Sequence, residues 1–119
     1  GNEQRHRVQT EQMRLSVCQN QADEVKDYLV KEINNKLINL REAGEQIRLT
    51  DRLMKTTSEN LDIAKAQYQA GTGSMLELTD SRIADLAAKQ QNIRAIAAYQ
   101  VALANLERLT GNTYENKEN

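Results

Sequence analysis

Apolar and small residues recur at alternating steps of three and four over most of the chain, a spacing typical of helices that pack side by side. The first part of this stripe consists of Leu15, Cys18, Ala22, Val25 and Leu29. Its continuation has larger residues seven apart and small ones between them: Leu40, Ile47, Met54, Leu61 and Tyr68, with Ala43, Thr50, Thr57 and Ala64. Because no proline interrupts residues 3–70, the pattern predicts one long helix over that range.

The strongest break in the helical pattern lies at residues 70–74. Glycine adopts the left-handed conformation that closes a helix without a Cβ penalty, so Gly71 is the expected C′ residue. Ser74 stands three residues before Glu77, the spacing of a capping box in which side chains and amides bond reciprocally. A turn at 71–74 between two long helices predicts an antiparallel helical hairpin.

A second helix is expected over about residues 75–109, with a glycine stop at Gly111. It carries two apolar stripes, rotated from one another: Leu76, Thr79, Ile83, Leu86 and Ile93, and then Ala95, Tyr99, Ala102, Leu106 and Leu109. The polar residues 112–119 are expected to form a disordered tail. The sequence thus predicts an all-α fold in which residues 1–111 form a single elongated helical hairpin.

The two predicted helices differ in length. At 1.5 Å per residue the first reaches roughly 100 Å and the second only about 50 Å. Leu109 would therefore lie opposite about residue 36, leaving an earlier apolar stripe without a partner in the chain. Since long helices owe most of their stability to packing, this half is expected to pair with another subunit or with segments outside this sequence.

The first helix also has apolar residues off its main stripe, which indicates a second contact face. They are Val30, Ile38, Leu49, Leu53 and Ile63. Gly44 interrupts the helical pattern and costs roughly 1 kcal/mol relative to alanine. It is either a tolerated surface glycine or a point of close approach by a neighbouring helix.

Composition supports an elongated helical protein rather than a rounded domain. In 119 residues there is no Pro, Phe or Trp, and charged residues make up 28%. The formal net charge of −1 gives no electrostatic footprint for nucleic acid or for an anionic membrane. The sequence lacks an apolar run of about 20 residues, so no membrane-spanning helix is expected. Because it begins Gly1-Asn2 without an initiator Met, the natural protein is expected to be longer.

Candidate chemistry is sparse. His6 and Cys18 are the single residues of their types and are too few for a zinc site or a Cys/His catalytic pair. Residues 71–74 lack the lysine of a phosphate-binding loop and follow no strand. The sequence predicts no enzyme, no cofactor and no metal site.

Two segments resemble the TolC-like outer-membrane efflux proteins. Residues 61–80 read LDIAKAQYQAGTGSMLELTD, similar to the family pattern of Ala-x-x-x-Tyr-x-x-Gly, a polar turn, and a helix that opens with an apolar–acidic–apolar run and an Asp. Residues 97–111 read AAYQVALANLERLTG and resemble the closing stretch of the family. Over residues 3–60 the sequence is compatible with the family in length and periodicity.

The resemblance implies a trimeric channel of Gram-negative bacteria, with a β-barrel in the outer membrane and an α-helical barrel crossing the periplasm. Each protomer of such a channel contributes two helical hairpins, each with a long and a short helix. This chain would be the second, C-terminal hairpin, located in the periplasm. Its turn would be the periplasmic tip, which docks an adaptor protein linked to an inner-membrane pump.

The resemblance also implies roles for residues near the turn. Tyr68, Gly71, Thr72, Gly73 and Ser74 would form the adaptor-docking tip. Two acidic residues would face and help gate the channel entrance, and they are Glu77 and Asp80. A ring of carboxylates would favour cations and would repel itself as the aperture narrows. Some members carry a basic residue in the turn where this chain has Gly73, so other contacts would have to hold a closed state.

The leading hypothesis is therefore the hairpin of an efflux or type I secretion channel. The alternative is a coiled-coil module, either an adaptor hairpin or an oligomerisation scaffold with no channel role. Nothing in the sequence identifies the exported substrate, the pump or the role of Cys18. In either case, self-association is expected, and a fragment without its barrel is expected to pair with another copy.

Overall fold

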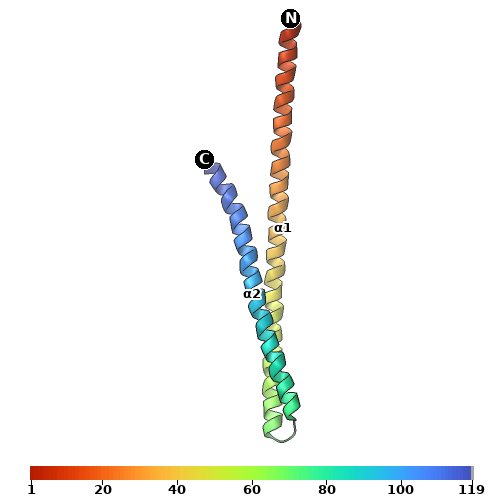
Figure 1. The fold of residues 1–119 in the computed structure, drawn as a ribbon, viewed down its shortest axis with the longest axis vertical. Helices are drawn as coiled ribbons and strands as arrows, with labels where there is room; N and C mark the ends of the chain where they lie inside the picture. Colours follow the sequence, from red (N-terminus) through yellow and green to blue (C-terminus); the bar gives the residue numbers. More distant parts are fainter. Residues whose placement is uncertain (119) are drawn as a thin grey trace. The chain divides into compact units, whose positions relative to one another are not determined.

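The computed structural model describes the backbone of residues 1–118 and the side chains of residues 1–111. It contains two helices, α1 (Asn2–Gln69) and α2 (Met75–Glu118), joined by a short turn (Figure 1). No strand occurs among the described residues. The predicted all-α hairpin is confirmed, with α1 beginning and ending within one residue of the expected bounds.

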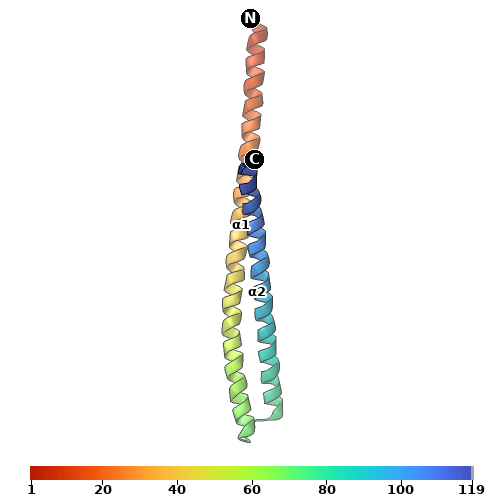
Figure 2. The same ribbon diagram turned by 90° about the vertical axis from the view of Figure 1, so that its left-hand side faces the viewer.

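The chain divides into two units, residues 1–35 and residues 36–119, and each is described by itself. In the second unit α2 runs back along residues 36–69 of α1, as both views show (Figures 1 and 2). The first unit is the N-terminal part of α1. Every side chain from residue 1 to residue 28 is exposed, including the predicted stripe members Leu15, Cys18 and Val25.

The face of α1 that packs against α2 is the predicted stripe. Thr50, Thr57 and Ala64 are buried at intervals of seven. The larger members between and before them are half-buried: Leu40, Ile47, Met54 and Leu61, together with Ala43. The residues of the expected second face lie on the surface, with Val30, Ile38, Leu49 and Ile63 about half exposed.

The face of α2 that packs against α1 was only partly predicted. Toward the C-terminus it is the second predicted stripe, in which Ala95 is buried and Tyr99, Ala102 and Leu106 are half-buried. Toward the turn it consists of residues that the sequence analysis did not group: Leu78, Ser81, Asp85, Ala88 and Asn92. The other predicted stripe is exposed, since Leu76, Ile83, Leu86 and Ile93 each keep more than half of their surface.

Gly44 lies on the packed side of α1, next to α2. A Cβ built on it would meet Tyr99 Cε2 at 3.7 Å, which is ordinary van der Waals contact. Of the two readings of this glycine, the structure supports approach by a neighbouring helix, although the space would admit a methyl group.

The predicted end of the second helix is wrong. α2 continues through Thr110 and Gly111, and Gly71 is the only described glycine with a positive φ. A glycine within a helix costs only about 1 kcal/mol, so Gly111 need not stop a helix where no turn is required. The predicted disordered tail, residues 112–119, lies outside the fully described residues and stays a prediction.

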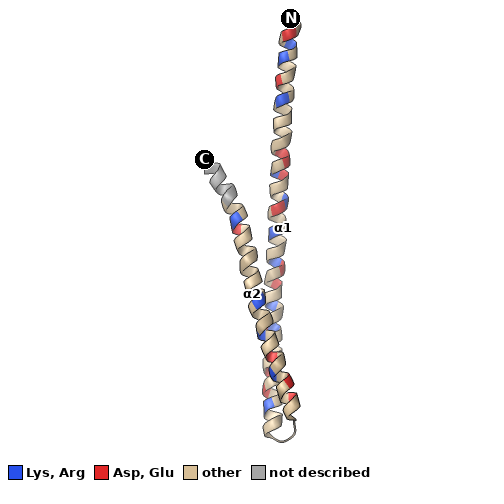
Figure 3. Ribbon diagram, viewed as in Figure 1, with Lys and Arg blue, Asp and Glu red and all other residues tan. Residues whose placement is uncertain are grey.

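Charged residues of both signs are scattered along the described parts of both helices (Figure 3). The stretch that includes the turn, residues 66–76, carries no charged side chain between Lys65 and Glu77, and neither do residues 95–106 of α2. Within the described residues, neither helix has a segment both long and apolar enough to span a bilayer.

Candidate functional site

The end of α1 is closed by a Schellman motif centred on Gly71. Gly71 has a φ of +76° and donates its amide to the Tyr68 carbonyl at 3.1 Å. The Thr72 amide donates to the Gln67 carbonyl at 2.9 Å. These are the two backbone bonds of that motif, and they satisfy carbonyls that the helix end would otherwise leave without a partner. The predicted role of Gly71 as the C′ residue is confirmed.

The start of α2 is closed by the predicted capping box. The Glu77 amide donates to Ser74 Oγ at 3.1 Å, and the Ser74 amide donates to Glu77 Oε2 at 3.4 Å. The first intrahelical bond follows at once, from the Leu78 amide to the Ser74 carbonyl at 3.2 Å. The Glu77 carboxylate also lies at the positive end of the α2 dipole, where a negative charge is favoured.

Gly73 is held tightly against the end of α1. Its amide donates to the Gln67 carbonyl at 3.0 Å, the same oxygen that accepts from the Thr72 amide and from Thr72 Oγ1. A Cβ on Gly73 would lie 2.9 Å from Gln67 Cβ, closer than real Cβ atoms approach. This turn therefore has no room for a side chain at position 73 unless it changes shape.

The remaining predicted tip residues form a small accessible surface. Tyr68 is 42% exposed, and Gly71, Thr72 and Ser74 are exposed as well. Met75 and Leu76, the first residues of α2, are exposed apolar neighbours of the turn that the sequence analysis had not included in the tip. The turn thus offers an aromatic ring, apolar side chains and peptide groups, but no charge.

The two predicted entrance residues differ in their surroundings. Glu77 is exposed but its carboxylate is engaged in the capping box. Asp80, one turn further along α2, is exposed and makes no hydrogen bond or ion pair with a described residue. A change at Glu77 therefore disturbs the helix end, whereas a change at Asp80 alters charge alone.

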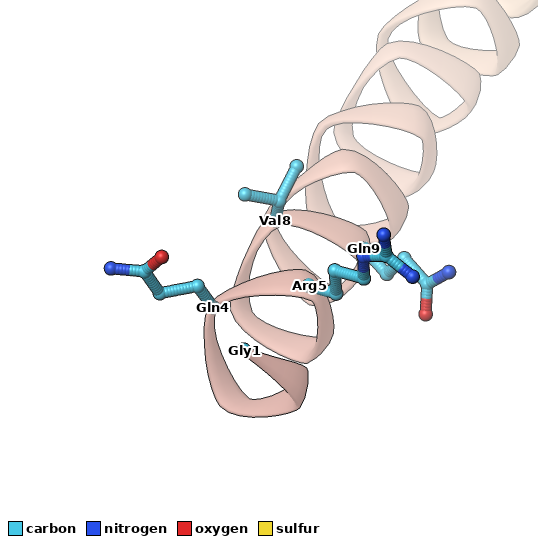
Figure 4. A pocket seen from close by; sticks show the side chains of 5 residues that line it. All are labelled: Gly1, Gln4, Arg5, Val8 and Gln9. Atoms are coloured by element: carbon cyan, nitrogen blue, oxygen red, sulfur yellow. The ribbon is translucent and has the colours of Figure 1, made fainter.

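Shallow surface depressions occur elsewhere on the described residues. The first turns of α1 have a shallow depression lined by Gly1, Gln4, Arg5, Val8 and Gln9. In Figure 4, Gln4 points away from Arg5 and Gln9, so these side chains do not converge on one point. Within the described part of the chain, no group of three or more His, Cys, Asp or Glu residues could hold a metal ion.

The model of the outer membrane efflux protein family matches residues 1–112. The chain belongs to this family. The match extends the resemblance of residues 61–80 and 97–111 over the whole N-terminal part of α1. Neither a search of curated proteins nor a search of solved structures gives a match.

Membership in the outer membrane efflux protein family identifies a transport protein of the outer membrane.

The structure adds two buried polar contacts of this family member that the sequence analysis missed. Thr57 Oγ1 donates to Asp85 Oδ1 at 3.1 Å, and Asn92 Nδ2 donates to Thr50 Oγ1 at 3.0 Å. Asp85 and Asn92 share heptad spacing with Ala88 and Ala95, and this spacing could have placed them on the packed face. A search for apolar stripes leaves such polar residues out.

Proposed function

We propose that this hairpin is part of the periplasmic α-barrel of a trimeric outer-membrane channel, and that its turn docks a periplasmic adaptor protein. The adaptor would link the channel to an inner-membrane pump in an efflux or type I secretion system. Family membership supports the channel, and the rigid, exposed turn supports the docking role.

The observation that carries the docking proposal is the way the turn is built. Backbone and capping bonds on both sides fix Gly71, Thr72 and Ser74, and all of these bonds lie within residues 66–78. A preorganised surface loses little conformational entropy when a partner binds. Tyr68 and Leu76 flank the turn with exposed apolar surface, and aromatic residues commonly anchor protein interfaces.

The channel proposal draws support from the second faces of both helices. α2 exposes Leu76, Ile83, Leu86 and Ile93 on the side away from α1. α1 exposes Leu49 and Ile63 off its packed stripe. A helix that is apolar on two sides touches more than one partner. Neighbouring hairpins of the same trimeric barrel are the occupants that we propose for these faces.

We further propose that Glu77 and Asp80 face the entrance of the assembled channel. Threefold symmetry would repeat both carboxylates around the opening and favour cations. Because Asp80 has no partner among the described residues, it is the residue whose charge is free to act there.

Crosslinking of a single cysteine to a cognate adaptor hairpin tests the docking proposal. Thr72→Cys is made in a Cys18→Ser background, and Lys31→Cys in the same background is the matched control, since both positions are exposed. We expect capture of the adaptor from position 72 and not from position 31.

Equal capture at both positions, or none at either, would contradict docking at the turn. Either result would favour the alternative of an oligomerisation module, which the exposed Leu and Ile side chains of α2 also support. A Tyr68→Ala variant of the Thr72→Cys protein should give less adaptor product, because it removes the aromatic ring beside the turn.

A further inference from the structure

α2 has two faces with heptad spacing, and the less apolar one packs against α1. Between the turn and residue 95 the packed face consists of Leu78, Ser81, Asp85, Ala88, Asn92 and Ala95. The opposite face consists of Leu76, Thr79, Ile83, Leu86, Gln90 and Ile93. The first has one large aliphatic side chain and the second has four. Burial of apolar area alone would turn the second face toward α1.

Two polar contacts join the packed faces. At one, Asp85 accepts from Thr57 through Oδ1 and pairs through Oδ2 with Lys89 Nζ at 3.0 Å. At the other, seven residues along each helix, Asn92 Nδ2 donates to Thr50 Oγ1 and to Asp51 Oδ1, the latter at 2.8 Å. Asp85 and Asn92 are only 6% and 7% exposed, yet no described buried side-chain N or O atom lacks a hydrogen-bond partner.

We propose that these two contacts, Thr57–Asp85 and Thr50–Asn92, select the face that α2 turns toward α1. Buried polar pairs are poor sources of net stability but strong determinants of alignment, because each is satisfied in one arrangement only. By binding the polar face to α1, they keep the Leu and Ile face at the surface. The proposal concerns the folding of the hairpin itself and goes beyond the proposed adaptor docking.

Two other features of the hairpin could orient α2 instead. The turn ties its first residues to α1, and small residues such as Ala64, Ala88 and Ala95 let the helix axes approach closely. Substitution of Thr50 and Thr57 distinguishes the polar contacts from these two other features. Valine has nearly the same shape as threonine but no hydroxyl, so Thr50→Val with Thr57→Val preserves the turn and the packing while removing the threonine contacts to α2. Asp51→Ala is made in the same protein, because Asp51 Oδ1 is the remaining acceptor of Asn92 Nδ2.

The readout is the reactivity of single cysteines toward a maleimide in a Cys18→Ser background. Ile93→Cys reports the exposed face, since Ile93 is 67% exposed, and Ala95→Cys reports the packed face, since Ala95 is 8% exposed. In the parent protein we expect the cysteine at 95 to react about tenfold or more slowly than that at 93, because a buried thiol reacts only on local opening. In the double valine variant we expect the order to reverse.

The control is Thr56→Val, which removes an exposed hydroxyl from the same helix and should leave the parent order unchanged. If the double valine variant keeps the parent order with full helicity, the turn or the small residues orient α2, and the proposal is wrong.

A second variant covers the case in which the valine protein does not fold. Thr50→Asn with Asn92→Thr exchanges the two partners across the interface and keeps one amide opposite one hydroxyl. We expect the parent order of reactivity in this protein. Equal reactivity at 93 and 95 in the folded exchange variant would overturn the proposal independently of the valine result.

Discussion

Single glycines have three different roles in this hairpin. Gly71 adopts a left-handed conformation, and Gly73 leaves the space that a Cβ would need beside Gln67. Gly44 is helical and has room for a methyl group. Gly44 lies in the middle of α1, where glycine is the costliest residue other than proline. These differences give predictions that separate conformational cost from steric cost.

Gly44→Ala should stabilise the hairpin by about 1 kcal/mol, because alanine has the higher helix propensity. The added methyl group would lie at contact distance from Tyr99, 3.7 Å from Cε2. Urea unfolding followed by circular dichroism measures the change. Repeating the Gly44→Ala measurement in a Tyr99→Ala background removes the contact with the Tyr99 ring, so that only the difference in helix propensity remains. A loss of stability in the otherwise unchanged protein would show that α2 needs glycine here.

Substitutions at Gly71 and Gly73 should respond differently to the choice of residue. Gly71→Ala is expected to cost about 1–2 kcal/mol for the left-handed conformation, and Gly71→Asn less, because asparagine tolerates it. At Gly73 the obstacle is Gln67 Cβ at 2.9 Å, which any Cβ meets. Gly73→Asn should therefore be no better than Gly73→Ala. Thermal unfolding of the four variants tests this, and rescue by asparagine at position 73 would contradict it.

At the scale of the helices, the sequence predicted the helix ends at the turn, which depend on neighbouring residues. It did not predict the polar contacts between the helices, which depend on residues far apart in the chain. The Schellman motif and the capping box involve residues within a few positions of each other, so Gly71, Ser74 and Glu77 could be assigned from spacing alone. Asp85 and Asn92 look like surface residues in the sequence. Their burial follows from Thr57 and Thr50, which stand 28 and 42 residues away. The predicted helix end at Gly111 was wrong because a glycine allows a helix to end but does not require it to.

The contact of Asp85 across the helices should give the hairpin an acid-sensitive component of stability. The Lys89 ammonium bonded to its carboxylate, assisted by the Thr57 hydroxyl and by the charges of Lys89 and Lys65, holds the pKa of Asp85 below its ordinary value of 3.8, against the opposing effect of burial. A carboxyl with a lowered pKa stabilises the fold above its unfolded pKa and loses this contribution as the pH falls through its folded pKa.

We therefore expect a constant difference in Tm between the parent protein and Asp85→Asn from neutral pH down to about pH 5. The difference should shrink as the pH falls below 3.8 toward the lowered pKa of folded Asp85, because the unfolded chain then binds the proton more readily than the folded one. Thermal melts across this range measure it, with Asp80→Asn as the control, since Asp80 has no partner among the described residues. A difference that persists unchanged at the acid end would mean that the Asp85 charge contributes nothing.

At the scale of the whole molecule, much of the apolar surface remains uncovered. No large side chain is fully buried among the described residues, while Val8, Met13, Leu15 and Leu76 are among those left more than half exposed. Helices owe most of their stability to packing, so a chain with so little buried surface depends on further contacts. This agrees with a family whose members work in the outer membrane as efflux proteins.

Helicity of this chain should accordingly depend on concentration. We expect circular dichroism to show loss of helix on dilution to the nanomolar range, as copies that cover the apolar faces dissociate. Leu86→Glu with Ile93→Glu should shift this loss to higher concentration, because it places charge on the exposed face of α2. Ser58→Glu, at an exposed position outside both stripes, is the control. Helicity that is unchanged on dilution would indicate a stable monomer.

The uncharged stretch at residues 66–76 has a consequence for the conditions under which a contact at the turn could form. Attraction between exposed charges weakens as dissolved ions accumulate around them. A surface of peptide groups, an aromatic ring and aliphatic side chains has no such attraction to lose. A partner held at this turn should therefore stay bound with similar affinity in dilute and in concentrated salt.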